Sequence, residues 1–277
     1  MMLYMRFPQG KAKALTLSYD DGIRQDLKLI EIMNKYGIKG TFNINSAFFG
    51  HSKIGEHGED RTRFTIEEAI ECYNNGGHEV ALHSSTHPSL DKIPHDMIAY
   101  EIIKDRETLE KIFGRIIKGM AYPMGTTNDE VVKVLKSCGV SYARTVEQTG
   151  KFDIPNDWLR MPATCHHNNP NLMAYAKDFV ENNSQPLPRL FYVWGHAYEF
   201  DVQNNWDRIE NFCKYVGGKE DIWYATNIEI YNYIEAYKQM KTSVNGKIIH
   251  NPTNTKLWFK HSDGREISIL PGETITL

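Results

Sequence analysis

The sequence predicts an α/β fold, in which a (β/α) barrel of about 7–8 parallel strands precedes a small antiparallel β appendage. Apolar, β-prone runs alternate with segments of helical periodicity from residue 14 to about residue 240. The connections between these segments are short, and around eight such units favour closure of the sheet into a barrel. An open, doubly wound sheet is the alternative fold, although no glycine-rich phosphate loop follows the first strand.

The predicted elements follow one another in a regular order. Residues 14–18 are expected to form a strand, and the helical pattern from Leu27 to Tyr36 ends at Gly37. Thr65 begins a second helix with a capping box, because Glu68 stands three positions later. The further strands are expected at 40–45, 79–82, 118–122, 140–146, 158–164, 188–194 and 222–226, and the further helices at 94–113, 128–135, 172–182, 206–216 and 228–240.

The pattern changes after Met240. Asn245-Gly246 and Asp263-Gly264 are typical of tight hairpin turns, and short β-prone runs flank both of them. We therefore expect two regions, a barrel in residues 1–240 and a small β appendage in residues 241–277. The default role of the appendage is to cover one end of the barrel, and a sugar- or partner-binding role is the alternative.

The composition restricts the possible partners. The chain has 277 residues, 41% of them hydrophobic, and a formal net charge of −3, so no basic field attracts a nucleic acid or an anionic membrane. The cysteines are widely separated and form no CxxC motif, which predicts reduced, structural thiols. The N-terminus lacks a signal-peptide pattern and no run approaches 18 apolar residues, so we expect a soluble, cytoplasmic protein.

Two short polar clusters each follow an apolar, β-prone run: Ser18-Tyr19-Asp20-Asp21-Gly22 and His83-Ser84-Ser85-Thr86-His87-Pro88. Each cluster is expected where a buried strand ends and a loop begins, which is where barrel proteins carry their catalytic groups. Two imidazoles four positions apart lie on one face of a helical turn, and a carboxylate from a neighbouring strand end completes three ligands with an open position. The clusters therefore predict a catalytic metal site.

Five motifs, taken together, resemble those of the polysaccharide deacetylase family, carbohydrate esterase family 4. The resemblance covers residues 14 to about 230 and implies a distorted barrel and metal-assisted hydrolysis of an N-acetyl group on an amino sugar or its polymer. The motifs are Ser18-Tyr19-Asp20-Asp21-Gly22, His83-x-x-x-His87-Pro88, Tyr122-Pro123-Met124-Gly125, Asp157-Trp158 and Trp194-Gly195-His196.

The resemblance implies a role for each of the reactive side chains. Asp21, His83 and His87 would hold one divalent ion, for which zinc is the first choice and cobalt, nickel or iron would also suit these ligands. Asp20 would act as the general base and His196 as the general acid that protonates the leaving amine. Because neighbouring side chains of an extended segment point to opposite sides, we expect one carboxylate to bind metal while the other stays free.

The resemblance also implies substrate contacts. The backbone N–H of Met124 would donate to the oxyanion, and Tyr122 belongs to the same motif. Trp158 and Trp194 would form the walls of a groove for the sugar.

Two features depart from the family pattern. Ala121 stands where the family usually has the arginine that orients the base. Arg160 is our first candidate to replace it, because Arg160 shares strand parity with Trp158, and Arg144 is the second candidate. Glu199 follows His196 in a run that differs from the family's shorter aliphatic motif.

The motifs are also compatible with other functions. The same fold and metal could serve another linear or cyclic amide, or the chain could bind carbohydrate after losing turnover with the arginine at position 121. The sequence does not identify the oligomeric state. Residues 47–64 form a long loop that could act as a lid, and His166-His167 is expected to be a solvated surface pair.

Overall fold

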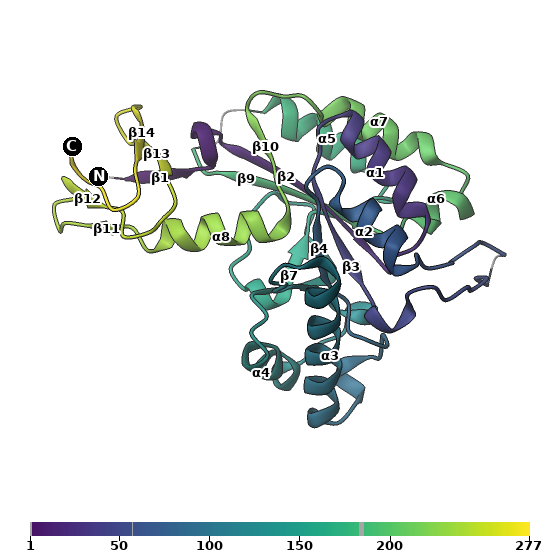
Figure 1. Cartoon of the computed structure of the whole chain (residues 1–277). Coiled ribbons are helices and arrows are strands. Elements are labelled where there is room, and N and C mark those ends of the chain that lie inside the picture. Colours follow the sequence, from purple (N-terminus) through teal and green to yellow (C-terminus); the bar gives the residue numbers. More distant parts are fainter. Residues whose placement is uncertain (1, 57, 183–185) are drawn as a thin grey trace.

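In the computed structural model, which describes residues 2–56, 58–182 and 186–277, the chain forms a parallel barrel with helices around it (Figure 1). The order of the main path is β7-β6-β5-β4-β3-β2-β9-β8, and β10 also pairs with β2. These strands are β2 (Lys13–Asp20), β3 (Gly40–Ile44), β4 (Glu79–Leu82), β5 (Gly119–Ala121), β6 (Tyr142–Gln148), β7 (Met161–Ala163), β8 (Cys165–His166), β9 (Arg189–Gly195) and β10 (Ile222–Tyr224).

The barrel closes through one continuous strip of chain. Strand β7 pairs with β6, and β8 pairs with β9 at the other end of the path. Only Thr164 separates β7 from β8, so this strip joins the two ends of the sheet. The predicted distorted barrel is confirmed, and its strand pairing is irregular here because the pairing of β6 with β7 shifts register between Arg144 and Gln148.

Helices surround the barrel, and the buried apolar residues form two clusters. The predicted capping box of α2 is present, because the side chains of Thr65 and Glu68 each bond to the other residue's backbone N–H. The helices are α1 (Gln25–Lys35), α2 (Ile66–Asn74), α3 (His95–Phe113), α4 (Asp129–Ser137), α5 (Leu172–Glu181), α6 (Tyr198–Val202), α7 (Trp206–Val216) and α8 (Asn227–Lys238). Among the described residues, none of the helices has both the length and the apolar content that a membrane crossing requires.

The interior of the barrel is polar. Thr16, Ser18 and Asp20 alternate along β2 and are all buried. The Asn43 amide donates to Ser18 and Asp20, and the Thr16 hydroxyl donates to Asn227 at the start of α8. Because buried polar groups need partners, this network fixes the inward side chains of the central strands.

Helix α8 closes the barrel at the N-terminal ends of its strands. Glu79 accepts hydrogen bonds from the Ile228 backbone, the Thr41 hydroxyl and the Tyr142 hydroxyl at 2.9, 2.9 and 2.7 Å. Burial is the main cause that raises the pKa of Glu79 to about 7, although these donors act against it. Helix α8 therefore fills the barrel at the N-terminal ends of the strands, and the C-terminal ends of the strands are the open ends.

The C-terminal residues form two small antiparallel sheets at one end of the molecule, next to α8 (Figure 1). One sheet has the order β1-β13-β14 and therefore takes its edge strand from the N-terminus, and the other has the order β11-β12-β15. The predicted division at residue 240 stays a prediction. The strands are β1 (Leu3–Arg6), β11 (Lys241–Thr242), β12 (Ile248–His250), β13 (Leu257–His261), β14 (Glu266–Ile269) and β15 (Thr274–Thr276).

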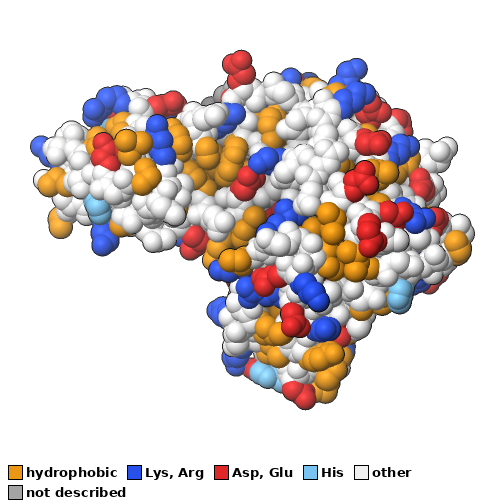
Figure 2. Space-filling model, in the orientation of Figure 1, with side chains coloured by type: hydrophobic (Ala, Val, Ile, Leu, Met, Phe, Trp, Pro, Cys, Tyr) orange, Lys and Arg blue, Asp and Glu red, His pale blue; other side chains and the backbone are white. Residues whose placement is uncertain are grey.

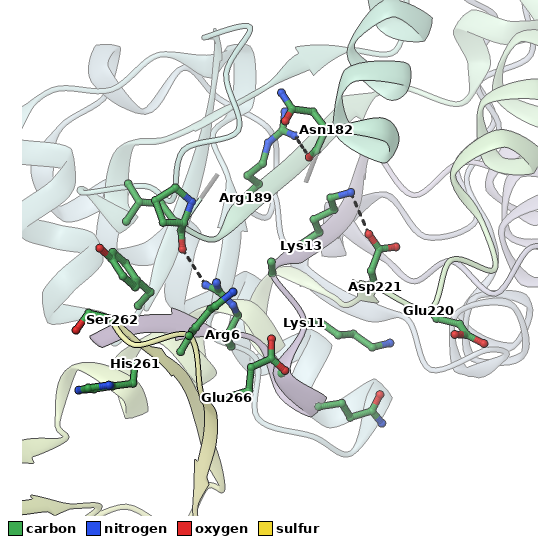
Figure 3. A pocket seen from close by; sticks show the side chains of 18 residues that line it. Arg6, Lys11, Lys13, Asn182, Arg189, Glu220, Asp221, His261, Ser262 and Glu266 are labelled. Atoms are coloured by element: carbon green, nitrogen blue, oxygen red, sulfur yellow. Dashed lines mark hydrogen bonds and ion pairs between the residues drawn. The ribbon is translucent and has the colours of Figure 1, made fainter. Parts of the chain in front are cut away.

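A polar cavity of about 620 Å³ lies where these sheets meet the barrel (Figure 3). Two of its cations are engaged by the protein: Lys13 pairs with Asp221 at 3.0 Å, and Arg6 donates to the carbonyl of Pro186 at 2.9 Å. The cavity lies at the N-terminal ends of the strands, because Lys13 is the first residue of β2. It is therefore remote from the predicted metal site.

The predicted loop at 47–64 contains an arm, which we define as residues 50–56 and 58–64. Antiparallel backbone bonds join its two sides, from Gly50 to Phe64, from Arg63 to His51 and from Arg61 to Lys53. The arm extends from the body of the molecule near α6 (Figure 1).

Acidic and basic side chains are interspersed on the face of the molecule shown in Figure 2.

Candidate metal centre

The two predicted clusters meet at the C-terminal ends of β2 and β4. Nε2 of His83 lies 3.1 Å from Nε2 of His87, and Oδ1 of Asp21 lies 3.9 Å from each of these nitrogens. A triangle with these sides has its centre about 2.1 Å from every corner, which is the usual length of Zn–N and Zn–O bonds. The geometry of this ligand triad (Asp21, His83 and His87) therefore fits one divalent ion.

The protonation of the imidazoles also fits an ion. Nδ1 of His83 lies 2.8 Å from the carbonyl oxygen of Ala121, which can only accept, so Nδ1 carries the proton and Nε2 presents its lone pair. Burial is the main cause that lowers the pKa of His83 to about 4, and burial also lowers the pKa of His87. Both imidazoles are thus neutral at physiological pH, which is the form that binds metal.

The triad is produced by strained loops rather than by a helical turn, which corrects the predicted local structure. The backbone at Asp21, Ser84 and His87 has positive φ values of 87°, 56° and 59°, and no helix follows β4 directly. Such conformations are costly for residues with a side chain and persist where the surroundings enforce them. The turn at Asp21 also brings both carboxylates toward His83: Oδ2 of Asp20 lies 3.9 Å from its Nε2, as Oδ1 of Asp21 does.

Helix α3 holds the histidine loop through two buried acids that the sequence analysis missed. Glu101 accepts from both the backbone and the hydroxyl of Thr86 at 2.7 Å, and Asp105 accepts from the backbone of His83 at 3.0 Å. Glu101 and Asp105 stand four positions apart within the apolar stripe of α3. Acidic residues in such a stripe are a sequence signal for buried acceptors.

Arg144, and not Arg160, binds the candidate base. Nη2 of Arg144 contacts both carboxylate oxygens of Asp20, and the guanidinium is fully buried with its centre 4.4 Å from the ring centre of Trp194. Burial of Asp20 opposes ionisation, but Arg144, with His83 and His196, outweighs burial and lowers the pKa of Asp20 to about 2. Asp20 is therefore ionised at any physiological pH.

The register of the sheet explains why Arg144 can take this role. Ala121 of β5 is the direct neighbour of Arg144 on β6, so the small side chain at 121 leaves space for the guanidinium. Arg160 instead pairs with Asp129 and Asp157. The parity argument for Arg160 was wrong because residues 158–160 form a 3-10 turn, in which side chains do not alternate.

His196 faces the same centre with a partner of its own. Nε2 of His196 lies 3.9 Å from Oδ2 of Asp20, and Nδ1 lies 2.8 Å from Oε1 of Glu199. Burial of His196 opposes protonation, but the bond to Glu199 and the charges of Asp21 and Asp20 outweigh it and raise the pKa of His196. The arrangement favours an imidazolium whose Nε2 points toward the candidate base.

Glu199, to which the sequence analysis assigned no role, contacts several polar side chains besides His196. Its Oε2 accepts from the Asn168 amide at 2.8 Å and lies 3.4 Å from Nε2 of His166 and 3.1 Å from Nε2 of His167. Nδ1 of His166 accepts from the Asn168 backbone, so its proton is on Nε2, which makes this nitrogen a donor to Glu199 rather than a metal ligand. The expected solvated pair was wrong, because His167 is fully buried.

The predicted substrate contacts divide into two groups. Trp194 is buried against the Arg144 guanidinium, so its role as a groove wall stays a prediction, and Met124 is exposed in a turn with a φ of 57°. Tyr122 is buried and donates to the carbonyl of Leu159, so the predicted contact with substrate is wrong for it. Trp158 is also buried, and its indole donates to Glu235 of α8 at 2.8 Å, so it is a packing residue rather than the wall of a groove.

The fold and these clustered donors define the chain as a barrel protein with a candidate metal centre at the open ends of its strands. The family model described as polysaccharide deacetylase matches residues 8–143. This match assigns residues 8–143 to the polysaccharide deacetylase family.

Individual relatives support this assignment. A peptidoglycan-N-acetylglucosamine deacetylase from Bacillus cereus is 26% identical over 128 residues, which are 46% of this chain and 41% of that protein. The chain thus matches about two fifths of the length of this relative.

Two solved structures share the fold. A Mycobacterium smegmatis protein classed with the polysaccharide deacetylases has a TM-score of 0.59 at 17% identity, over 86% of this chain and 95% of that chain. A family 4 carbohydrate esterase from Streptomyces lividans, in complex with acetate, has a TM-score of 0.52 at 15% identity, over 78% and 93%.

Proposed function

We propose that the chain is a metal-dependent hydrolase that removes an N-acetyl group from an amino sugar or its polymer. The observation that carries the proposal is the meeting of four functions at one place: a triad that fits a divalent ion, an ionised carboxylate, a cation on that carboxylate and a protonated imidazole. Family membership gives the proposal its substrate class. The named activity of the Bacillus cereus relative is the removal of this kind of group from peptidoglycan.

Asp21, His83 and His87 would hold the ion, with zinc as the first choice. When bound, a divalent ion would polarise the acetyl carbonyl and make a water molecule more acidic. Oδ2 of Asp20 lies 3.9 Å from Nε2 of both His83 and His196, so this oxygen faces the reacting group, whereas Oδ1 is held by Asn43. Asp20 Oδ2 would take the proton from the attacking water as general base.

His196 would then protonate the leaving amine. Its Nδ1 proton is held by Glu199, so the second proton of the imidazolium is on Nε2, which faces Asp20 and the reacting group. Glu199 would position the His196 imidazole and stabilise its charged form. The exposed turn at Met124 would supply its backbone N–H to the oxyanion.

A protein that has lost turnover because position 121 lacks arginine is disfavoured, since Arg144 supplies the missing cation. Hydrolysis of another amide would use the same residues, so only an assay with different substrates distinguishes it from the proposed deacetylation.

The decisive experiment measures acetate release from N-acetylglucosamine oligomers. Protein stripped by a chelator should release no acetate, and Zn²⁺ or Co²⁺ at about one equivalent per chain should restore release. The control variant is His95→Gln, a change at an exposed histidine, which should behave as the wild type does. In His83→Gln, by contrast, added metal should not restore acetate release. Metal-independent release, or none from any acetylated sugar with full metal content, would contradict the proposal.

Replacing Glu199 by Gln is expected to lower kcat at least about tenfold and to move the alkaline limb of the pH profile to lower pH. The bond to Glu199 raises the pKa of His196, so its loss lets burial lower that pKa, and the acid form then disappears at lower pH. A pH–rate profile, with NMR titration of His196, checks this. Asp201→Asn in the same helix is the control, and an unmoved alkaline limb in Glu199→Gln would rule out the positioning role.

A further inference from the structure

Arg63, at the base of the arm, places a second cation beside the ligand triad. Its backbone forms an antiparallel bridge with Ile23, two residues after Asp21, so the arm returns to the same loop that carries the candidate ligand. Nη2 of Arg63 lies 3.5 Å from Oδ1 of Asp21, the oxygen that faces both histidines. The arm thus delivers a guanidinium to the edge of the metal centre.

One buried donor of this guanidinium is not satisfied by the described part of the protein. A separation of 3.5 Å is longer than a hydrogen bond, and among the described residues Asp21 is the one carboxylate within 4.0 Å of Arg63. Nη1 is buried and has no hydrogen-bond partner in the described part of the chain. A buried cationic donor without a partner is costly, so an acceptor supplied by a bound ligand would be stabilising here.

The charges around the centre point to the kind of acceptor. Arg144 neutralises Asp20, and Glu199 neutralises the imidazolium of His196. With a divalent ion in place, Asp21 would offset one of its two positive charges, and Arg63 adds another. The loaded centre therefore has a net positive charge, which favours an anion, and a guanidinium fork suits a carboxylate.

We propose that Arg63 is a carboxylate-binding residue of this centre. The inference rests on the proposed function, because it assumes an ion on the triad. The carboxylate has two possible sources: the acetate that hydrolysis releases, or an acid group on the sugar substrate. Both present the same planar pair of oxygens to the guanidinium.

The first test measures the affinity of the zinc-loaded protein for sodium acetate by calorimetry, without turnover. Arg63→Met should weaken acetate binding about tenfold or more. Arg63→Lys keeps the charge but not the two parallel donors, so its acetate affinity should lie between those of the wild type and Arg63→Met. Arg24→Met is the matched control, since Arg24 lies on the loop that carries Asp21, just before α1, but pairs with Glu68 at 2.9 Å. This control should bind acetate as the wild type does.

The second test separates the sources. If Arg63 takes the product, Arg63→Met should raise the inhibition constant of acetate about tenfold while KM for a neutral oligomer stays within about twofold. If it takes an acid group of the substrate, KM should rise for an oligomer with a carboxylate on alternate sugars and stay unchanged for the neutral one. A change in either assay supports a carboxylate role.

Other outcomes overturn the inference. Unchanged acetate affinity in both Arg63 variants, or no acetate binding by the wild type, would remove it. A loss of bound zinc in Arg63→Met, measured by atomic emission, would show that Arg63 supports Asp21 as a ligand instead. Failure of the proposed function looks different: the protein would release no acetate from any sugar, yet its acetate binding would still depend on Arg63.

Discussion

Replacing Arg144 by Met is expected to lower acetate release at least about 100-fold and the free energy of unfolding by roughly 3–5 kcal/mol. The Arg144 guanidinium is fully buried and contacts both oxygens of Asp20. Methionine retains the apolar stem beside Trp194 but leaves a buried carboxylate without its cation. Steady-state kinetics and urea unfolding measure the two losses.

The pH dependence of Arg144→Met distinguishes loss of charge from loss of packing. In the wild type the pKa of Asp20 is lowered to about 2, so this group contributes stability that is present above its unfolded pKa and lost as pH falls through about 2. Without Arg144, burial dominates and raises that pKa. The acidic limb of the activity profile should then move to higher pH, and stability should increase as pH is lowered toward the unfolded pKa.

Arg160→Met is the control for this experiment. Arg160 is partly exposed and pairs with Asp129 and Asp157 at the surface, where an ion pair contributes about 1 kcal/mol or less. Its replacement should leave kcat and the acidic limb unchanged. Equal losses from the two variants would contradict the assignment of Arg144.

The exchange of Ala121 and Arg144 tests the register argument directly. These residues are neighbours on β5 and β6, so Ala121→Arg combined with Arg144→Ala returns the arginine to the position usual in the family. The double variant should recover at least about tenfold of the activity lost in Arg144→Ala. No recovery in a folded double variant would show that the two positions are not equivalent.

The sequence was a sufficient guide to the strands that carry the site because both are β-prone runs that end at a polar cluster. The run 14–18 became the central strand β2, and the run before His83 became β4. The antiparallel strands after residue 240 were also expected from their turns. Their pairing with β1 was not, because an edge strand that joins a distant sheet carries no local signal.

The candidate site was predictable where it depends on spacing and unpredictable where it depends on register. His83 and His87 meet as expected, although positive φ values rather than a helical turn bring them together. The prediction of Arg160 over Arg144 assumed that residues 158–160 are extended. They form a 3-10 turn, so the Arg160 side chain does not point toward Asp20 and Arg144 takes the role. Burial of His167 likewise depends on its stacking against Phe200, 4.2 Å between ring centres, which no single segment reveals.

Replacing Asp20 by Asn is expected to lower acetate release at least about 1,000-fold while the protein keeps its zinc. The amide has nearly the same shape but cannot take a proton from water, and Asp20 is not a member of the ligand triad. Kinetics and metal analysis of the same preparation measure the two quantities. Asp129→Asn, a change at an exposed carboxylate, is the control and should retain full activity.

The double variant of Asp20→Asn and Arg144→Met tests whether both side chains act as one unit. If Arg144 works only through the Asp20 carboxylate, its replacement should cost little further activity once that carboxylate is gone, so the two losses should not add. Stability should show the same coupling, because an unpaired buried guanidinium is removed in the double variant. Additive losses of activity would mean that Arg144 contacts substrate independently, and substantial turnover in Asp20→Asn would mean that another group takes the proton.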